Sequence, residues 1–230
     1  MRPLRATSLI AELLRYNGYQ PYFPVTTFEI TLNQDTPDRL NGEKITSLKN
    51  NNEFLFESVT RRKFQRLMYD ACDVLNKGFA KNPMFVPLTV EEFWFQAKEM
   101  MWVMDPNISL VAYHGDNPAG VVICIPDLNP LLKSVKSRLS LSLPFKYLRY
   151  RFSRERAVII YYSVTPEHHG KGLNSLMLQE ITNRLLSNNY KSLGVTWIAD
   201  VNNASLRQME KLGGKPLHKL HLFRKSLSHA

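Results

Sequence analysis

The sequence predicts a mixed α/β domain, and three patterns carry that prediction. Apolar residues recur at three- and four-residue steps between residues 64 and 104, which is the spacing of amphipathic helices. Two β-rich runs follow between residues 109 and 125, joined by a turn-like HisGlyAspAsnPro segment. From residue 157 onward, strand-like and helix-like stretches alternate. This order is typical of a mixed α/β architecture.

Length and composition allow one domain with a sizeable core. The chain has 230 residues, of which 44% are hydrophobic and 22% charged, and this composition argues against a disordered or collagen-like chain. No uncharged apolar run approaches the roughly 18 residues that cross a bilayer. The longest, residues 120–126, is strand-sized. We therefore do not expect an integral membrane protein.

The expected elements follow from these patterns. Thr89 and Glu92 form a capping box that opens a helix running to Met104. A stretch rich in Asn, Asp, Gly and Pro at residues 33–52 indicates a linker. We expect helices over 7–16, 64–75, 89–104, 173–188 and 205–212, and strands over 26–32, 109–113, 120–125, 157–164, 192–199 and 217–226.

The cysteines and the N-terminus indicate a cytoplasmic protein. Cys72 and Cys124 lie far apart and have no partners at ligand spacing, so neither a disulfide framework nor a metal site is expected. The N-terminal stretch MRPLRATSLIAELLRY is basic, but it lacks the apolar core and cleavage site of a secretory signal. An amphipathic helix is favoured there over an organelle presequence.

The segment from Val164 to Asn174, ValThrProGluHisHisGlyLysGlyLeuAsn, lies where a strand gives way to a helix. Gly170 and Gly172 allow a tight turn and a close approach of backbone N–H groups to a ligand. The unpaired N–H groups and positive dipole of a helix start favour a phosphate or pyrophosphate, and Lys171 adds a mobile charge. A glycine pair can also be a plain turn, but this context favours an anion site. The spacing matches neither a Walker A loop nor a dinucleotide fingerprint.

This loop resembles the coenzyme A loop of the GCN5-related N-acetyltransferase (GNAT) superfamily. That loop reads [Gln/Arg]-x-x-Gly-x-[Gly/Ala] after a strand ending in Val-x-Pro. Gly172 matches the central glycine, whereas His169 and Asn174 replace the residues of the family pattern. The chain has His169-Gly170-Lys171-Gly172-Leu173-Asn174 at these positions.

A second block, AspValAsnAsnAlaSerLeuArgGlnMetGluLysLeuGlyGly, is similar to the downstream Asn-x-x-Ala-x-x-x-Tyr-Glu-Lys-x-Gly-Phe stretch of the family. Asn202 falls on the family asparagine, and Met209 falls where many members carry the tyrosine that protonates the departing thiolate. A methionine has no proton to give, so the usual acid is absent there. The likeness covers about residues 60–228 and is closer to an uncharacterised bacterial subgroup, whose longer relatives carry an upstream part. Residues 7–32 resemble the tail of that part.

The resemblance implies the GNAT fold, a mainly antiparallel sheet flanked by helices. Its central strands, here 157–164 and 192–199, would splay to leave a slot for the pantetheine arm of acetyl-CoA or another acyl-CoA. Val164 would offer backbone groups to the pantetheine, residues 169–174 would hold the pyrophosphate, and Asn202 would contact the coenzyme further along. The chain then divides into a helix–strand remnant of an upstream part (1–33), a linker (34–58) and an acyltransferase domain (59–230) with a basic insertion (130–156).

Amine attack on a thioester needs a neutral amine, a polarised carbonyl and a proton for the thiolate. Tyr161 and Tyr162 alternate across their strand, and Tyr162 is the candidate acid, with core packing as its alternative. Asp200, just beyond the other strand, is the candidate base acting through water, with a turn or cap role as its alternative. His168 and His169 adjoin the loop, and one of them could contact the anion.

The basic insertion concentrates the charge of the chain. Residues 133–156 hold eight basic residues and one acid, which is +7 of the formal net charge of +10, and such a patch points to an anionic ligand or surface. Nucleic-acid stacking and an anionic membrane surface are two interpretations, and a solvated rim that attracts acyl-CoA is favoured.

The sequence thus predicts an acyl-CoA-dependent N-acyltransferase acting on a small-molecule or protein amine. The alternative is a non-catalytic GNAT-like module that binds CoA, nucleic acid or an anionic membrane.

Overall fold

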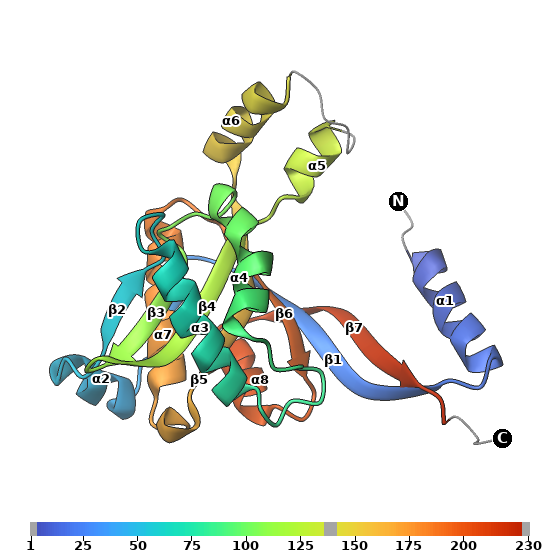
Figure 1. Cartoon of the computed structure of the whole chain (residues 1–230), viewed down its shortest axis with the longest axis horizontal. Helices are drawn as coiled ribbons and strands as arrows, with labels where there is room; N and C mark the ends of the chain where they lie inside the picture. The colour runs from blue at the N-terminus through green and yellow to red at the C-terminus, as the bar shows by residue number, and fades with distance from the viewer. Residues whose placement is uncertain (1–3, 136–141, 227–230) are drawn as a thin grey trace.

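The computed structural model describes residues 4–135 and 142–226, with side chains from residue 9 onward. Within this part, seven strands form one sheet in the order β2-β3-β4-β5-β6-β1-β7 (Figure 1). Neighbouring strands are antiparallel except β5 and β6, which are parallel. A mixed, mainly antiparallel sheet flanked by helices confirms the predicted fold class. The strands are β1 (Gln20–Thr31), β2 (Leu55–Ser58), β3 (Leu110–His114), β4 (Asn117–Pro126), β5 (Arg156–Val164), β6 (Ser192–Ala199) and β7 (Lys215–Arg224).

The helices lie close to their expected positions, with one difference. The capping box is present, because Glu92 N–H donates to Thr89 Oγ1 and Thr89 N–H donates to Glu92 Oε2. The single helix expected over 89–104 is wrong: α4 ends at Ala97 and continues as a 3-10 helix. Tighter turns also place residues three apart on one side, so the apolar spacing did not reveal the change. The helices are α1 (Leu4–Tyr16), α2 (Glu43–Asn50), α3 (Phe64–Gly78), α4 (Val90–Ala97), α5 (Asn129–Val135), α6 (Leu143–Ser153), α7 (Leu173–Ser187) and α8 (Asn203–Lys211), with 3-10 helices η1 (Pro37–Leu40), η2 (Lys98–Trp102) and η3 (Pro166–His168).

Apolar cores cover both faces of the sheet. Along β4, Val121 and Ile123 belong to the core under α3 and α4, whereas Val122 and Cys124 belong to the core under α7 and α2. Successive side chains of a strand point to opposite faces, so a strand covered on both sides is apolar throughout. The sheet is therefore the middle layer of three (Figure 1).

The central strands β5 and β6 separate halfway along their length. They pair only over residues 156–159 and 192–195. Beyond that point β5 stays paired with β4 as far as Val164, and β6 stays paired with β1 as far as Ala199. The predicted splay is confirmed, and it opens a gap between two strands that are each held by their outer neighbour.

The segment expected as a linker, residues 34–58, instead contains η1, α2 and β2. Ile45 and Leu48 of α2 are buried in the core shared with α7. Gln179 of α7 donates to the Pro37 carbonyl at 2.8 Å and to Asn41 Oδ1 at 2.7 Å. The Asn, Asp, Gly and Pro signals mark the turns between these short elements, not an unstructured stretch.

The N-terminal strand β1 lies inside the sheet, between β6 and β7. Its first half and β7 extend beyond the body as a two-stranded arm, and α1 lies at the end of that arm (Figure 1). β7 is exposed along nearly its whole length. The upstream segment thus completes the sheet that carries the splay.

The basic insertion forms a helical hairpin of α5 and α6 that projects from the body (Figure 1). Arg154 at its base donates to buried Asp105 at 2.5 Å, and Arg156 pairs with Glu29 and Asp127. These two arginines therefore stabilise the junction of hairpin and body and do not form a solvated rim. Lys136 and Arg138 lie outside the described residues.

Candidate active site

A cavity of about 400 Å³ opens where β5 and β6 separate. Its walls come from the end of β5, the following loop, the end of β6, the start of α8 and the loop after α3. Five of the predicted coenzyme residues and the candidate acid Tyr162 line it. Leu173, by contrast, is fully buried in the core. Lys171 is exposed and lines neither this cavity nor the second cavity described below. The predicted residues that line the cavity are Tyr162, Val164, His169, Gly170, Asn174 and Asn202.

The loop before α7 depends on two left-handed glycines. Gly170 has φ +73° and Gly172 has φ +99°, values that residues with a side chain rarely adopt. Gly172 is the N-cap of α7 and offers no side chain to cap it. The first N–H groups of the helix have no acceptor within the helix itself, so they are available to an anion. A Cβ on Gly172 would also lie 3.3 Å from Lys44 Cβ.

A second cavity of about 290 Å³ adjoins the first at the start of α7. Its lining contains Lys44, Arg207 and Lys211 and no acidic residue. Lys44 Nζ donates to the Gly170 carbonyl at 2.9 Å, which ties α2 to the loop. Three cations beside open helix N–H groups form an arrangement suited to the phosphates of a coenzyme.

The two loop histidines have different surroundings. The His169 ring lies 3.1 Å from the Val164 carbonyl, and since a carbonyl only accepts, Nε2 carries the proton. His168 Nδ1 lies 3.0 Å from Thr165 Oγ1, and its ring contacts Phe54 and His114. Burial lowers the pKa of His168, and the nearby His114 adds to this effect. His168 lines the cationic cavity and His169 the cavity at the splay.

Gly78, the last residue of α3, allows the helix to touch β5. A Cβ there would lie 2.0 Å from Ser163 Oγ and 2.7 Å from the Val164 carbonyl oxygen. No rotamer change removes the backbone contact, so only glycine fits without a shift of the helix. Gly78 therefore sets the width of the cavity beside Val164.

Tyr162 lies between the sheet and α7. Its hydroxyl donates to the Asn174 carbonyl, and Gln208 Oε1 lies 3.4 Å away. Burial raises the pKa of Tyr162 well above its usual value, so the hydroxyl holds its proton at neutral pH. Met209, at the position of the family tyrosine, is 1% exposed and packs in the core. The phenol in the cavity wall is therefore that of Tyr162.

The two polar residues after β6 are held by local contacts. Asn202 is the N-cap of α8 and accepts a hydrogen bond from Ser205 N–H at 3.1 Å. Asp200 accepts from Thr26 Oγ1 at 3.0 Å, and its backbone N–H donates to the Pro24 carbonyl. Asn202 lines the cavity at the splay, whereas Asp200 lines neither of the two cavities described above.

An apolar pocket of about 480 Å³ lies on the α4 side of the splay. Its lining includes Ile160, Tyr161, Thr196 and Trp197, just beyond the last paired residues of β5 and β6, but it shares no lining residue with the first cavity. Trp197 of β6 is 62% exposed at the pocket and has φ +48°, a strained value for a bulky residue. The lining of the apolar pocket holds no charged side chain. It consists of Met68, Phe93, Gln96, Ala97, Met100, Ile123, Ile160, Tyr161, Thr196 and Trp197.

The described residues were found to hold neither a metal-binding cluster nor a membrane-spanning helix. Residues 4–135 and 142–226 contain no group of three or more His, Cys, Asp or Glu side chains that could hold a metal ion. Over the same residues, no helix has the length and hydrophobicity needed to cross a membrane.

The sequence prediction missed the three cations of the second cavity. Lys44 lies in the segment that was expected as a linker, so no signal pointed to it. Arg207 and Lys211 could have been found, because they lie three and seven residues after Ala204 and share its face of α8. Two curated proteins are similar in sequence to this chain. The chain is 20% identical over 178 residues to Protein YghO of Escherichia coli (strain K12), covering 74% of this chain and 45% of that protein.

A second relative is the protein named bacterial ceramide synthase of Caulobacter vibrioides, 22% identical over 164 residues, which cover 67% of this chain and 42% of that protein. The chain thus spans less than half the length of either curated relative. Among solved structures, a GCN5-related N-acetyltransferase from Sphaerobacter thermophilus has the same fold, with a TM-score of 0.62 and 17% identity over 98% of this chain and 57% of that one. The model of the acetyltransferase (GNAT) family matches residues 74–213, which include the splay, the glycine loop and α8. The chain therefore belongs to the acetyltransferase (GNAT) family.

Proposed function

We propose that this protein transfers the acyl group of an acyl-CoA, such as acetyl-CoA, to the nitrogen of an amine. The observation that carries the proposal is the junction of two cavities at the start of α7. One is lined by Lys44, Arg207 and Lys211 and suits phosphates. The other follows the separated ends of β5 and β6 and suits the narrow pantetheine arm. Membership of the acetyltransferase family supports acyl transfer in general.

Different residues of the chain would bind different parts of the coenzyme. The N–H groups after Gly172 and the three cations would bind the phosphates. The backbone at Val164 and the wall formed by Gly78 and Asn202 would hold the arm in the slot. Bound acyl-CoA supplies a thioester whose carbonyl carbon is open to attack by an amine.

Tyr162 is the group we propose to hold and donate a proton. Tyr162 lines the cavity, and its phenol is protonated at neutral pH, although burial raises its pKa and makes it a weaker acid than a free tyrosine. A thiolate that leaves the acyl carbon needs a proton at that moment. Asp200, as a base for the amine through water, remains a prediction, and the Asp200→Asn variant tests it by its effect on kcat.

The apolar pocket favours a hydrocarbon chain on one of the two substrates. Pockets of several hundred Å³ that are mostly apolar bind ligands of matching hydrophobicity, and this one holds no charged side chain. Residues of β5 and β6 just beyond their last pair line it, so a chain attached near the reacting atoms would reach it through the splay. The relative named bacterial ceramide synthase supports an N-acylation with a long-chain substrate. We propose that long-chain acyl-CoAs or long-chain amines react faster than short ones.

The first test is calorimetric titration of acetyl-CoA at physiological salt. We expect saturable binding by the native protein and loss of binding in Gly172→Glu, because that variant puts a carboxylate at the phosphate site and a side chain on a left-handed residue. Gly115→Glu is the matched control, since Gly115 also has positive φ, with nothing within 4 Å of its Cβ position, and lies in the β3–β4 turn. Desulfo-CoA separates coenzyme binding from recognition of the thioester.

The second test is an amine screen that follows thiol release from acetyl-CoA and from a long-chain acyl-CoA. Release that depends on both an amine and Gly172 supports the transferase. Absence of coenzyme binding at millimolar concentration would overturn it. Binding of any polyanion with a steep salt dependence, without preference for CoA, would favour the non-catalytic module.

A further inference from the structure

We propose that the outward face of α6 docks this protein on an anionic lipid surface. This proposal does not depend on the acyl-transfer reaction. It rests on three features of the hairpin of α5 and α6: a second apolar face on α6, arginines on both sides of that face, and a rigid attachment that points it away from the body.

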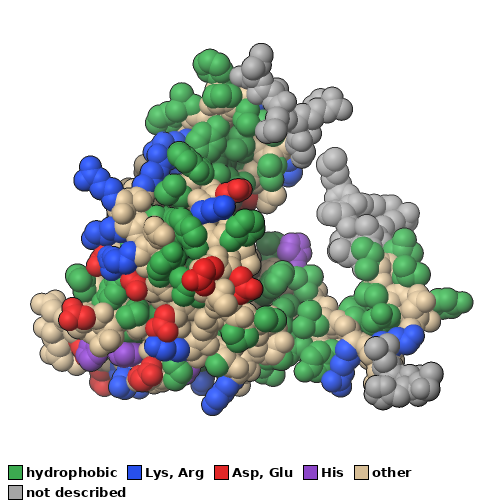
Figure 2. Space-filling view, viewed as in Figure 1, with side chains coloured by type: hydrophobic (Ala, Val, Ile, Leu, Met, Phe, Trp, Pro, Cys, Tyr) green, Lys and Arg blue, Asp and Glu red, His purple; other side chains and the backbone are tan. Residues whose placement is uncertain are grey.

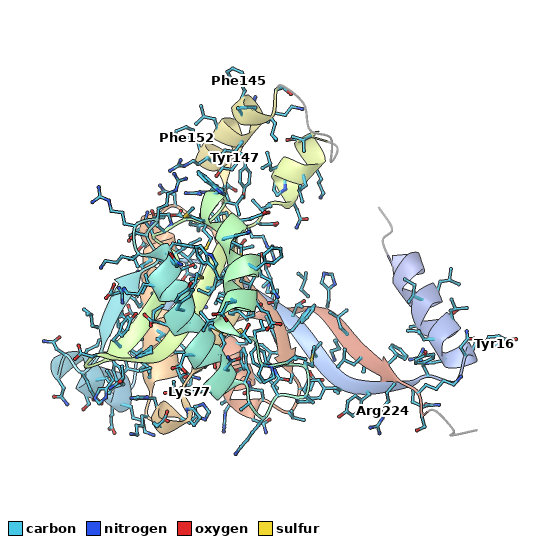
Figure 3. The ribbon with its side chains drawn as sticks, viewed as in Figure 1. Tyr16, Lys77, Phe145, Tyr147, Phe152 and Arg224 are labelled. Atoms are coloured by element: carbon cyan, nitrogen blue, oxygen red, sulfur yellow. The ribbon has the colours of Figure 1, made fainter. Side chains whose placement is uncertain are left out.

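Helix α6 has two apolar faces. The inner face carries Leu143, Tyr147 and Tyr150, which pack in a small core with α5. The outer face carries Phe145, Leu148 and Phe152, which are 77%, 53% and 83% exposed. These three share one side of the helix because they lie three and seven residues apart. Figure 3 shows Phe145 and Phe152 pointing away from the body and Tyr147 on the side toward it.

The outer apolar face is flanked by positive charge. By helix geometry, Arg149 follows Phe145 and Phe152 on one side of the face, and Arg151 adjoins Leu148 on the other. Neither arginine makes an ion pair with any residue that the structure describes. Lys146 donates to the Ser134 carbonyl at 3.0 Å and so lies on the side of α6 toward α5. Helix α6 contains no acidic residue, and Figure 2 shows hydrophobic side chains at this end with Lys and Arg beside them.

The hairpin is attached firmly to the body. Tyr147 OH donates to the Trp102 carbonyl at 2.9 Å, and Tyr150 OH donates to the Asp127 carbonyl at 2.8 Å. At the end of α6, Arg154 is paired with Asp105, which is 2% exposed. These contacts fix the inner face, so the exposed face cannot turn inward. A fixed, projecting helix with an apolar stripe and basic flanks is the form of an interfacial helix.

A lipid surface fits this face better than the other polyanions or a protein. Single-stranded nucleic acid is held in basic grooves with flat stacking platforms, whereas this face is convex and has Leu148 at its centre. Protein interfaces have a polar rim around an apolar core, whereas the rim described here is formed by arginines. Anionic headgroups accept the arginines while the acyl region accepts Phe145 and Phe152.

The test is co-sedimentation with vesicles of phosphatidylcholine, with and without phosphatidylglycerol. We expect binding to the anionic vesicles that weakens with salt. Phe145→Ser with Phe152→Ser should weaken it by about tenfold or more, because the inserted apolar area is lost. Arg149→Ser with Arg151→Ser should weaken it by about tenfold at low salt and less at high salt. None of these four side chains makes a hydrogen bond, ion pair or ring contact with the described part of the body, so the variants should melt at the native temperature.

A matched control lies on α1, the other exposed amphipathic helix. Leu13→Ser with Tyr16→Ser removes side chains that are 60% and 89% exposed and should leave vesicle binding unchanged. A thiol-reactive fluorophore on Leu148→Cys should shift to the blue with anionic vesicles, and one on Val86→Cys should not. The native cysteines are both buried and do not compete.

Four outcomes would overturn the proposal. The first is that the native protein and both α6 variants bind vesicles equally, and the second is that the α1 control loses as much vesicle binding as the α6 variants do. The third is that Arg149 and Arg151 bind single-stranded DNA but not vesicles. The fourth is that the protein self-associates through Phe145 and Phe152 without binding vesicles.

Discussion

Two cavities near the splay of β5 and β6, one at its α7 end and one at its α4 end, have opposite chemistry. At the α7 end, Lys44, Arg207 and Lys211 surround open helix N–H groups and no acid lines the cavity. At the α4 end, the lining is apolar and carries no charge. Between them, Tyr161 of β5 lines the apolar pocket, and Tyr162 lines the cavity at the splay. The two regions therefore differ in chemistry: the cationic one suits phosphates and the apolar one suits hydrocarbon.

The difference shows how one splay can serve two kinds of recognition. Phosphates are bound by fixed donors and charges, which depend on backbone geometry at Gly170 and Gly172. Hydrocarbon is bound through the apolar surface area that is buried on binding, and many different side chains can supply that area. Substitutions at the α7 end should therefore affect every acyl-CoA, and substitutions at the α4 end should distinguish long substrates from short ones.

The largest effect is expected at the junction of the two ends. Tyr162→Phe should lower kcat by about 100-fold, because a positioned proton donor contributes this much, while the affinity for acetyl-CoA stays unchanged. Steady-state rates and calorimetry give the two values. Tyr161→Phe is the control, since Tyr161 lies on the pocket side and packs against Phe93. An unchanged kcat in Tyr162→Phe would remove this residue from proton transfer.

At the apolar end, Met100→Glu should raise the KM of a long-chain substrate by about tenfold or more, because a carboxylate in an apolar site must be desolvated. The affinity for acetyl-CoA should not change. Met100→Leu keeps the volume and the apolar character and should behave as the native protein. If Met100→Glu weakened acetyl-CoA equally, the two ends of the cleft would not be independent.

At the cationic end, Arg207→Ala with Lys211→Ala should weaken coenzyme binding by about tenfold at low salt, and by less as salt screens the charges. Lys215→Ala removes an exposed lysine from β7, outside the lining of the cavity, and is the matched control. Equal weakening in the control would indicate a general field effect of the basic chain and no specific phosphate site.

The sequence predicted the backbone loop of the charged end, though not its three cations, and gave no sign of the apolar end. Gly170 and Gly172 are visible because a glycine pair between a strand and a helix has few other uses, and the structure gives both positive φ. No sequence pattern identifies Phe93 and Met100 as pocket residues. Apolar residues at helical spacing predict a core whether or not a pocket lies beside them. The splay itself was expected only through the family resemblance.

Long-range placement escaped sequence reasoning for a different reason. Local signals at residues 34–58 showed turns, but the burial of Ile45 and Leu48 depends on α7, more than 100 residues away. Likewise, alternation predicted the strand at 26–32 but not its place between β6 and β7. The neighbours of a strand depend on all the strands of the sheet, and the alternation within one strand does not predict them.

The smallest effect is expected from His168, which lines the cationic cavity. Burial lowers the pKa of His168, so the unfolded chain binds this proton more readily than the native protein does. Through this group, native stability is greatest above the ordinary histidine pKa of about 6.5 and falls as pH drops below it. A bound phosphate favours the protonated ring, so coenzyme should raise the pKa of His168 and bind more tightly as pH falls through the same range. An NMR titration of the ring with and without CoA measures this shift, and His168→Gln should abolish the pH dependence. A pKa that falls on adding CoA would place the phosphates away from His168 and leave Lys44, Arg207 and Lys211 as their sole cationic contacts in this cavity.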